Sequence, residues 1–397
     1  MYGRLPLVQK RRPASAVVGG FTVDVYFEIV CVEKDWRALE MAGHYTYYQT
    51  FAWCSSWART VGISRKIQPL IIVAKNHDED IAFILPFQIS TRFGIKILEW
   101  LSQPENNYGT GLFSSPPLPS SWFENNFAQL LAVLPSFDVV NFQNMPAMIG
   151  KAPNPLHHIN QFAAANSSYV TTLHSDFDVL LLQKRSAKSI SKMRRRDERL
   201  DELGVVSFEA EKPGTAAGLR LVEVCNDKDV QLSELGIHGV FAPEERAFLA
   251  QLQAQTIAGR PSMGIFRLAL DGKTLSTLVG GLSGSTFWLM LTALAPQTPK
   301  QFSPGDILLR RTIEHCCTAG FDVFDFSNGE VGYKKIWCDD EVLLHNYFSA
   351  RSIRGLPVAA ALFGYHTLKR QFKKSPLLRR LFESARRKFR GKSSNCT

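Results

Sequence analysis

Short runs of alternating apolar and polar residues, separated by helical patterns, predict a mixed α+β fold. In the first half of the chain, two β runs at 69–75 and 81–89 flank the polar turn Asn76–Asp80, as in a hairpin. The other elements predicted in this half are strands at 21–25, 95–101 and 137–142 and helices at 36–41, 50–59 and 122–134. The loop at 102–120 is rich in Asn, Gly, Ser and Pro.

The second half repeats this order with clearer signals. The helix predicted at 186–203 has one narrow apolar stripe and ends at Gly204, a residue suited to a left-handed cap. The elements predicted after it are strands at 205–209, 263–270, 274–283, 287–293 and 321–326 and helices at 217–227, 243–258 and 304–319. We therefore expect two tandem units, each a mixed, mostly antiparallel sheet flanked by helices.

The length of 397 residues favours two domains, because a single hydrophobic core rarely serves so long a chain. The predicted parts are a loose arm at 1–20, a first domain at 21–165, a second domain at 166–352 and a basic amphipathic tail at 353–397. The join falls between 147 and 171, where the sequence has no clear periodicity.

The net charge of +10 belongs to the tail. Residues 366–397 contain eleven Lys or Arg and one acid, which leaves 35 basic and 35 acidic residues over 1–365. A neutral body argues against wrapping nucleic acid, which requires a broad positive surface. From Ser375 onward the pattern predicts a basic amphipathic helix suited to an anionic membrane surface, and a solubilising or RNA-binding tail is the alternative.

The cysteine and histidine patterns predict no metal site. The seven cysteines include no CxxC pair, and His157-His158 has no partner at metal-ligand spacing. His315 precedes Cys316-Cys317, for which core packing is the simpler explanation. No apolar stretch approaches the ~20 residues needed to cross a bilayer, and the start of the chain does not resemble a secretory signal. We expect a cytoplasmic protein that its basic tail can hold at the inner membrane.

The segment Ser303-Pro304-Gly305-Asp306 follows a predicted strand and opens a predicted helix. Ser303 suits the N-cap, Pro304 suits the first helical position, and Asp306 stands where a capping box has its acid. Backbone amides of this turn could hold a diphosphate at the positive end of the helix, with Gly305 allowing close approach. A well-capped helix without a ligand explains the same residues.

Two further stretches offer candidate chemistry. The strand at 287–293 can pair with the amides of an extended ligand if its edge separates from the neighbouring strand. After the strand end at Asp325, a glycine-bearing loop brings Glu330, Tyr333 and Lys334, which are groups that accept or return protons. In the alternative explanation, Asp325 caps the loop and Lys334 pairs with it.

A basic segment at 184–199 carries eight Lys or Arg against two acids. Charged residues are readily accommodated on the solvated face of a helix, which is the simpler explanation. The functional alternative is recognition of a phosphorylated acceptor, such as a lipid-linked or nucleotide sugar.

The order of these motifs resembles the GNAT superfamily of acyl-CoA transferases. The residues that carry the resemblance are Ser303-Pro304-Gly305, Ile307-Leu308-Leu309, Gly320, Phe324-Asp325-Phe326, Gly329, Tyr333-Lys334 and Trp337. The pattern is most similar to the CelD-like branch, which is associated with bacterial cellulose and exopolysaccharide synthesis. The basic helix at 188–196 and the aromatic residues at 36–57 are similar to that branch as well. The resemblance covers about 23–350 and implies two GNAT-like domains in tandem, as in the Fem-type peptidyltransferases, with the acyl-CoA in the second.

The resemblance also implies roles for individual residues. The catalytic candidates are Asp325, Glu330, Tyr333 and Lys334. Acetyl-CoA or another acyl-CoA is expected at Leu291, Thr292, Ala293, Ser303, Gly305, Asp306 and Ile307. The acceptor is expected at Asn107, Tyr108, Trp288, Trp337 and Arg195. Where the family often has an Asp-Tyr pair in the N-terminal loop, this chain has Asn107-Tyr108.

The resulting hypothesis is direct acyl transfer to an amine or hydroxyl of a sugar or polysaccharide precursor, without a metal. Backbone amides near Thr292 or Ala293 would polarise the thioester carbonyl. Asp325 or Glu330 would take the proton of the acceptor, and Tyr333 would return one to the thiolate. Two alternatives stay open. In the first alternative, the donor is an aminoacyl-tRNA, as in Fem-type enzymes, and the basic helix and tail hold the RNA. In the second, the chain is a non-catalytic GNAT-like scaffold in exopolysaccharide assembly.

Overall fold

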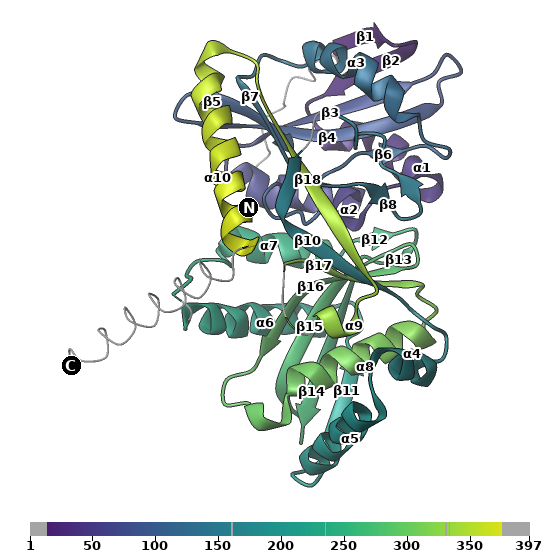
Figure 1. Cartoon of the computed structure of the whole chain (residues 1–397), viewed down its shortest axis with the longest axis vertical. Helices are drawn as coiled ribbons and strands as arrows, with labels where there is room; N and C mark the ends of the chain where they lie inside the picture. Colours follow the sequence, from purple (N-terminus) through teal and green to yellow (C-terminus); the bar gives the residue numbers. More distant parts are fainter. Residues whose placement is uncertain (1–13, 160–161, 235, 330–331, 333, 375–397) are drawn as a thin grey trace, which may run out of the picture.

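The computed structural model describes residues 14–374, except 160–161, 235, 330–331 and 333. A single sheet of 14 strands runs the length of the molecule (Figure 1). Its strands follow the order β1 (Ala14–Val18), β2 (Phe21–Tyr26), β3 (Gln68–Lys75), β4 (Ile81–Arg92), β5 (Ile95–Trp100), β7 (Val139–Pro146), β18 (Asp340–Ala350), β10 (Phe162–Thr172), β17 (Val323–Asn328), β16 (Thr286–Leu294), β15 (Lys273–Ser283), β14 (Met263–Leu270) and β11 (Val206–Ala210), with β6 (Leu112–Phe113) paired to β4. Separate two-stranded sheets are formed by β8 (Met148–Ile149) with β9 (Ala152–Pro153) and by β12 (Thr256–Ile257) with β13 (Arg260–Pro261).

Helices cover this sheet. They are α1 (Glu33–Ala42), α2 (Phe51–Trp57), α3 (Ser120–Val133), α4 (Phe177–Lys184), α5 (Ala187–Asp201), α6 (Thr215–Ser233), α7 (Pro243–Gln253), α8 (Pro304–Thr318), α9 (Lys334–Trp337) and α10 (Leu356–Lys374). Short helical turns are η1 (Ile29–Val32), η2 (Tyr47–Gln49), the π-type η3 (Ala58–Gly62), η4 (Lys300–Phe302) and η5 (Ile353–Gly355).

Each half of the sheet contains the same four-strand unit. In the first half, β3, β4 and β5 form an antiparallel meander, and β7 then joins β5 in parallel after α3. In the second half, β14, β15 and β16 form the meander, and β17 joins β16 in parallel after α8. A parallel neighbour requires a crossover connection, which the helix of each unit supplies. The mixed α+β architecture predicted from the sequence is confirmed.

Two long strands exchange between the halves and make the sheet continuous. The last strand, β18, returns to the first half and pairs antiparallel with β7 on one side. On its other side β18 pairs antiparallel with β10, which in turn pairs with β17 of the second half. Figure 1 shows the two strands crossing the middle of the molecule together. The predicted boundary between 165 and 166 therefore falls within a sheet strand.

The two halves also share a hydrophobic core. One buried cluster contains Trp53 and Trp57 of α2 together with Leu221 of α6 and Phe248 of α7. The rings of Trp53 and Phe248 meet edge to face with their centroids 4.8 Å apart. Each half has in addition a cluster of its own, beneath α3 in the first half and beneath α8 in the second. The halves consequently act as one packed body with a buried interface.

Several predictions of the sequence analysis are corrected. Residues 14–18, assigned to a loose arm, form β1 against β2. The helix predicted at 243–258 ends at Gln253, and 256–257 form β12. β10 and β18 were not predicted, because β10 reads FAAANSSYVTT and β18 opens with Asp-Glu, so neither shows the alternation of a half-buried strand.

The start of the predicted tail is well formed. Residues 353–355 form η5 and 356–374 form α10, which lies against β10, β18 and β7. The amphipathic helix predicted from Ser375 lies outside the described residues. Among the helices that are described, none is both long enough and apolar enough to cross a membrane.

Candidate active site between β16, α6 and α8

β16 and β17 pair over only three positions, which end at Trp288 opposite Asp325. Past this point β16 continues to Leu294 against β15, while β17 continues to Asn328 against β10. A bulge at Met290 interrupts the pairing of β16 with β15 just after the separation begins. The edge of β16 that faces away from β15 is therefore released from strand pairing, as the sequence analysis required.

The released edge of β16 is contacted by side chains of α6. Lys228 Nζ donates to the carbonyl of Thr292 at 2.9 Å, and Gln231 Nε2 donates to the carbonyl of Leu294 at 3.2 Å. The N–H and C=O of a strand residue point to the same side, so the amides of these two residues lie along the same edge. Burial lowers the pKa of Lys228. The α6 side chains thus satisfy part of an edge that an extended ligand could use.

A cavity of about 520 Å³ lies beside this edge. Its lining comes from α6, β15, β16 and the start of α8, and consists of Lys228, Gln231, Ser276, Thr277, Leu278, Thr292, Ala293, Leu294, Lys300, Ser303, Pro304, Gly305, Asp306, Leu308 and Leu309. Thr277 is 1 % exposed, and its hydroxyl has no hydrogen-bond partner among the described residues. A buried polar atom without a partner is costly, so this hydroxyl points to a ligand group that would complete its bonding.

The start of α8 differs from the predicted capping box. Ser303 occupies the N-cap position in a left-handed conformation (φ 51°), and its side chain makes no cap bond. Its carbonyl instead accepts from the amides of Asp306 (2.9 Å) and Ile307 (3.2 Å). Gly305 lines the cavity, where an added Cβ would lie 3.5 Å from Leu294. The turn is held by its own backbone, and Gly305 keeps the helix N-terminus approachable from the cavity.

Two arginines compensate the acid at this helix start. Asp306 accepts from Arg196 at 3.0 Å and from Arg185 at 3.4 Å. The Arg185 guanidinium also lies 5.2 Å above the ring of Trp337, which is fully buried and stacks near Phe177. Trp337, an expected acceptor residue, therefore sits in the core beneath the arginine. α5 is anchored to the start of α8 by these contacts.

A second group of predicted residues surrounds Asp325 at the closed end of the strand separation. Asp325 is 2 % exposed and accepts from the Tyr108 hydroxyl and from the Ser327 amide, each at 2.6 Å. Burial raises the pKa of Asp325 to about 7, opposed by these two hydrogen bonds and by the nearby Lys334 charge. A carboxyl group with this pKa is half ionised near neutral pH, which suits a general base.

Lys334 does not form the ion pair with Asp325 that the alternative explanation of this segment required. Its Nζ donates to the carbonyls of Ser327 (3.1 Å) and Asn328 (3.2 Å), and no contact within ion-pair distance joins it to the carboxylate. Burial lowers the pKa of Lys334 to about 8. The lysine therefore fastens the loop that follows β17 and contributes a positive charge near Asp325.

The first half of the chain supplies the other wall of this group. Asn107 Nδ2 donates to the Tyr48 hydroxyl at 2.6 Å, and that hydroxyl lies 3.1 Å from Ser327 Oγ. The half-buried ring of Trp288 stands perpendicular to the rings of Tyr48 and Tyr108, with centroids 6.1 and 5.5 Å apart. Its indole N–H is buried and has no partner within the described part of the chain. Both halves are thus required to assemble the site.

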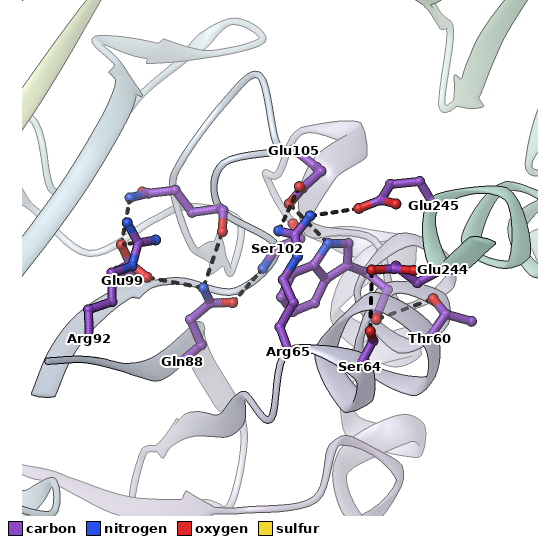
Figure 2. A network of polar contacts seen from close by, with 12 residues as sticks. Thr60, Ser64, Arg65, Gln88, Arg92, Glu99, Ser102, Glu105, Glu244 and Glu245 are labelled. Carbon is purple, nitrogen blue, oxygen red and sulfur yellow. Dashed lines mark hydrogen bonds and ion pairs between the residues drawn. The ribbon is translucent and has the colours of Figure 1, made fainter. Parts of the chain in front are cut away.

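The corresponding position in the first half is closed by the protein itself. Glu99 and Asn141 occupy the last parallel pair of β5 and β7, as Trp288 and Asp325 do in β16 and β17. Gln103 bonds the released edge of β7 through the carbonyl of Asn141 (3.1 Å) and the amide of Gln143 (3.3 Å). Glu99, which is 2 % exposed, accepts from Ser90 and Asn141 at 2.8 Å each. Figure 2 shows Glu99 with two further neighbours, Gln88, which donates to it at 3.3 Å, and Arg92 at 4.0 Å.

An ion-pair network ties the loop that carries Asn107 and Tyr108 to the second half. Arg65 lies 2.8 Å from Glu105 and 2.6 Å from Glu245 of α7, so it bridges the two halves (Figure 2). Glu105 also accepts from the indole of Trp57 at 3.2 Å. The position of the Tyr108 hydroxyl on Asp325 therefore depends in part on the ion pairs of Arg65 with Glu105 and Glu245, which lie some distance from both residues.

The predicted site residues thus fall into two groups, one at the Thr292–Leu294 edge of β16 and one around Trp288 and Asp325, where β16 and β17 separate. Thr292 and Trp288 lie four residues apart on β16, a rise of about 13 Å. Leu291 lies on β16 and Ile307 is buried in the core of the second half, and neither lines the cavity. Arg195 is exposed on α5 and lines a separate hollow with residues of α4. Glu330 and Tyr333 lie outside the described residues.

Sequence reasoning missed Tyr48, Thr277 and Lys228. Tyr48 precedes α2 without any motif, and Thr277 and Lys228 stand among other polar residues (Ser276-Thr277, Asp227-Lys228-Asp229) with nothing to set them apart. Ser327 follows Asp325 by two residues on β17, and its left-handed conformation (φ 57°) places its amide on that carboxylate. No cluster of three or more His, Cys, Asp or Glu within the described ranges could hold a metal ion.

Comparison with known proteins supports this picture of the second half. Residues 187–335 match the sequence model of the acetyltransferase (GNAT) domain. No curated protein sequence matches the chain. Two crystal structures share its fold at 10% identity, namely FemX (TM-score 0.54, covering 83% of this chain and 98% of that one) and the C-terminal domain of a putative lysylphosphatidylglycerol synthetase from Agrobacterium fabrum (TM-score 0.51, 85% and 95%). At this identity the likeness extends to the fold, which in FemX spans both halves of the chain.

Proposed function

We propose that the chain is an acyltransferase that binds an acyl-CoA in the cavity between α6, β16 and the start of α8. The main observation that supports this proposal is the unpaired edge of β16, which lies beside a cavity that reaches the N-terminus of α8. A volume of about 520 Å³ falls within the range typical of small-molecule sites. The match of residues 187–335 to an acetyltransferase domain supports the assignment.

The lining suits the parts of an acyl-CoA. The amides of its pantetheine arm can bond the Thr292–Leu294 edge, with Lys228 and Gln231 beside them. The diphosphate would lie at the start of α8 next to Gly305 and Lys300, where the helix dipole favours negative charge. The unpartnered hydroxyl of Thr277 supplies a further hydrogen-bonding group.

The Asp325 group supplies the proton acceptor in this proposal. An acceptor nitrogen or oxygen attacks the thioester carbonyl carbon, its proton passes to the Asp325 carboxylate, and the C–S bond breaks to release a thiolate. Tyr108 orients the carboxylate, and Lys334 contributes positive charge nearby. Backbone amides of β16 at the bulge around Met290 would stabilise the oxyanion, because Thr292 itself lies about 13 Å along the strand from Trp288, the partner of Asp325. Tyr333 stays the predicted group that returns a proton to the thiolate.

A sugar amine or hydroxyl is the proposed acceptor, in line with the resemblance to the CelD-like branch. Trp288, Tyr48 and Asn107 offer an aromatic face and polar groups around the carboxylate. An amino sugar of a polysaccharide precursor is therefore the first acceptor class to test.

Thermal-shift and thiol-release assays with acetyl-CoA and longer acyl-CoAs test the proposal. A tight ligand at 100 times its Kd should stabilise the folded protein by about 2.7 kcal/mol. Thr277→Val should weaken binding by about fivefold to tenfold, the equivalent of one hydrogen bond of about 1 kcal/mol. Thr312→Val is the matched control, because the Thr312 hydroxyl is buried within α8 on the carbonyl of Leu308. Absence of a shift with every CoA species would remove the donor assignment.

An aminoacyl-tRNA donor is the second candidate. One observation favours it: α5 exposes Lys188, Lys192, Arg194, Arg195 and Arg199 while its Arg196 contacts the start of α8. These cations stand beside the end of the cavity where phosphates would lie. Binding of tRNA that weakens steeply with salt, together with no response to acyl-CoA, would favour this candidate over the first.

A further inference from the structure

The pairing of β7 with β18 is irregular beside the loop that carries Tyr108. The register shifts between His345 and Tyr347, where the single residue Asn346 lies opposite two residues of β7, 143–144. This arrangement is a β-bulge, which disrupts the ladder locally and leaves the extra residue of the longer strand unpaired. The bulge therefore gives β7 backbone groups that can bond outside the sheet.

Asn144, in this bulge, has a left-handed conformation (φ 58°) and bonds in two directions. Its amide donates to Oδ1 of Asn346 at 3.0 Å, and its carbonyl accepts from the amide of Gly109 at 3.0 Å. Gly109 follows Tyr108, whose hydroxyl donates to Asp325. A continuous path of hydrogen bonds and backbone therefore leads from β18 to the Asp325 carboxylate.

The backbone around Tyr108 is held on both sides. The Tyr108 carbonyl accepts from Gln49 Nε2 at 2.8 Å. On the other side, Gly109 is pressed so closely on β7 that an added Cβ would clash with the ring of Trp100 and the carbonyl of Gln143. A shift of the bulge would consequently be passed on to Tyr108, because the packing leaves Gly109 no room to absorb it.

Helix α10 fixes the other end of the Asn346 amide. Asn346 is 1 % exposed, and its Nδ2 lies 3.4 Å from Nδ1 of His366 on α10. An amide nitrogen only donates, so Nδ1 of His366 must be the acceptor and the ring must be neutral. Burial, together with the nearby Lys369 charge, lowers the pKa of His366 to about 4, which keeps the ring neutral at pH 7. The imidazole also packs on Phe348, with ring centroids 5.0 Å apart.

We propose that Asn346 is a positioning residue for the acyl transfer, because it holds the bulge of β7 that keeps the Tyr108 hydroxyl on Asp325. Without the Asn346 side chain, the amide of Asn144 loses its bond, and the bulge can relax with the carbonyl of Asn144 turned away from Gly109. The importance of this path for catalysis rests on the proposed role of Asp325 as the base. β18 would then both join the two halves and set the geometry of the site between them.

The test measures the pKa of Asp325 in the full chain, by difference infrared spectroscopy of the carboxyl band that Asp325→Asn removes. Asn346→Ala should raise this pKa by about half a unit to one unit, because the bond from Tyr108 is weakened but not removed. In the Tyr108→Phe background the same substitution should cause no further rise, because both changes act through one hydrogen bond. An unchanged pKa in Asn346→Ala, or a further rise of the same size in the double variant, would overturn the proposal.

Asn154→Ala is the matched control. Asn154 is 0 % exposed, and its side chain likewise donates to one backbone group and accepts from another, the carbonyl of Pro146 at 2.8 Å and the amide of Leu156 at 3.1 Å. Both alanine variants should lower the midpoint of urea unfolding, but only Asn346→Ala should move the pKa of Asp325. An equal rise in the control would show a general loosening of the fold and exclude a positioning role.

A pair of substitutions at Asn144 tests the bulge without a change in β18. The left-handed conformation of this residue is unfavourable for alanine and readily adopted by glycine. Asn144→Ala should therefore raise the pKa of Asp325, whereas Asn144→Gly should leave it as in wild type. If Asn346→Ala does not fold, this pair decides, and equal pKa values in its two members would contradict the proposal.

The infrared measurement needs no substrate, so it separates this inference from the proposed function. The titratable groups that interact with Asp325 are Tyr108, Tyr48, Lys334 and Cys338, and the single substitutions in β7 and β18 leave all four in place. The acidic limb of kcat/KM for thiol release should follow the infrared pKa. A raised pKa with an unmoved limb would support the positioning of Tyr108 and reject Asp325 as the base.

Discussion

Replacing Tyr108 with phenylalanine removes one hydroxyl and so isolates its effect on Asp325. The hydroxyl donates to the carboxylate at 2.6 Å inside a site where Asp325 is 2 % exposed. Burial raises the pKa of Asp325, and this bond, which stabilises the ionised carboxylate, helps to hold that pKa at about 7. Tyr108→Phe should therefore raise the pKa of Asp325 further.

The size of the shift follows from the bond. A hydrogen bond to a charged group contributes about 1.5–3 kcal/mol, and one pKa unit corresponds to about 1.36 kcal/mol. The pKa should rise by about 1–2 units. If the reaction needs the ionised carboxylate, activity at pH 7 should fall by about fivefold to fiftyfold and recover at higher pH.

The assay is the pH dependence of kcat/KM for thiol release. Its acidic limb, near pH 7 in wild type, should move to higher pH in Tyr108→Phe. Tyr48→Phe is the control, because the Tyr48 hydroxyl bonds Ser327 and Asn107 and not the carboxylate. A limb that stays at the same pH in Tyr108→Phe would refute the role of Asp325 as the base.

Three further changes test the framework. Asp325→Asn should remove a pH dependence of the free energy of unfolding. The carboxyl group of Asp325 keeps its proton up to about pH 7 in the folded protein but only up to about pH 4 in the unfolded chain. As the pH rises from about 4 to about 7, wild type should therefore lose up to about 4 kcal/mol of stability relative to the variant, as measured by urea unfolding. Arg65→Ala should lower the free energy of unfolding by about 1–2 kcal/mol and lower kcat, because Glu105 and Glu245 lose their ion-pair partner. The control Arg37→Ala removes a surface ion pair of similar exposure and should lower the free energy of unfolding by less than about 1 kcal/mol in the same measurement. Gly281→Ala should destabilise by about 1–3 kcal/mol in thermal unfolding, since its Cβ would lie 2.4 Å from the Tyr47 ring.

The sequence predicts elements well where local chemistry determines them. β14 was predicted with the bounds that the structure gives, because alternation and the turn at Asp271-Gly272 mark both of its ends. β10 and β18 could not be predicted, because each lacks a regular alternation and β18 pairs with β7 and β10, which lie far from it in the sequence. Pairing across long sequence separations leaves no local pattern to detect.

The candidate site was predicted in its local parts and missed in its long-range parts. Asp325 and Gly305 stood in recognisable turns at the ends of strands and helices. The capping role of Ser303 was wrong, because a left-handed backbone turns its side chain away from the helix amides. Tyr48 reaches Ser327 across 279 positions, a contact that only the exchange of β10 and β18 makes. Nothing in the sequence around Tyr48 marks it.

The two repeated units differ at the place where their parallel strands separate. Each unit releases a strand edge after its third parallel pair, and backbone groups at such an edge need partners when they are buried. In the first half Gln103 supplies them on β7, the strand that corresponds to β17, from a loop that is itself fixed by Glu99 and Arg65 contacts. In the second half the partners are the long side chains of Lys228 and Gln231 on the neighbouring helix, beside a cavity. Long side chains can move aside for a ligand, whereas a loop packed on the strand cannot, and this difference is why we propose the donor site in the second half.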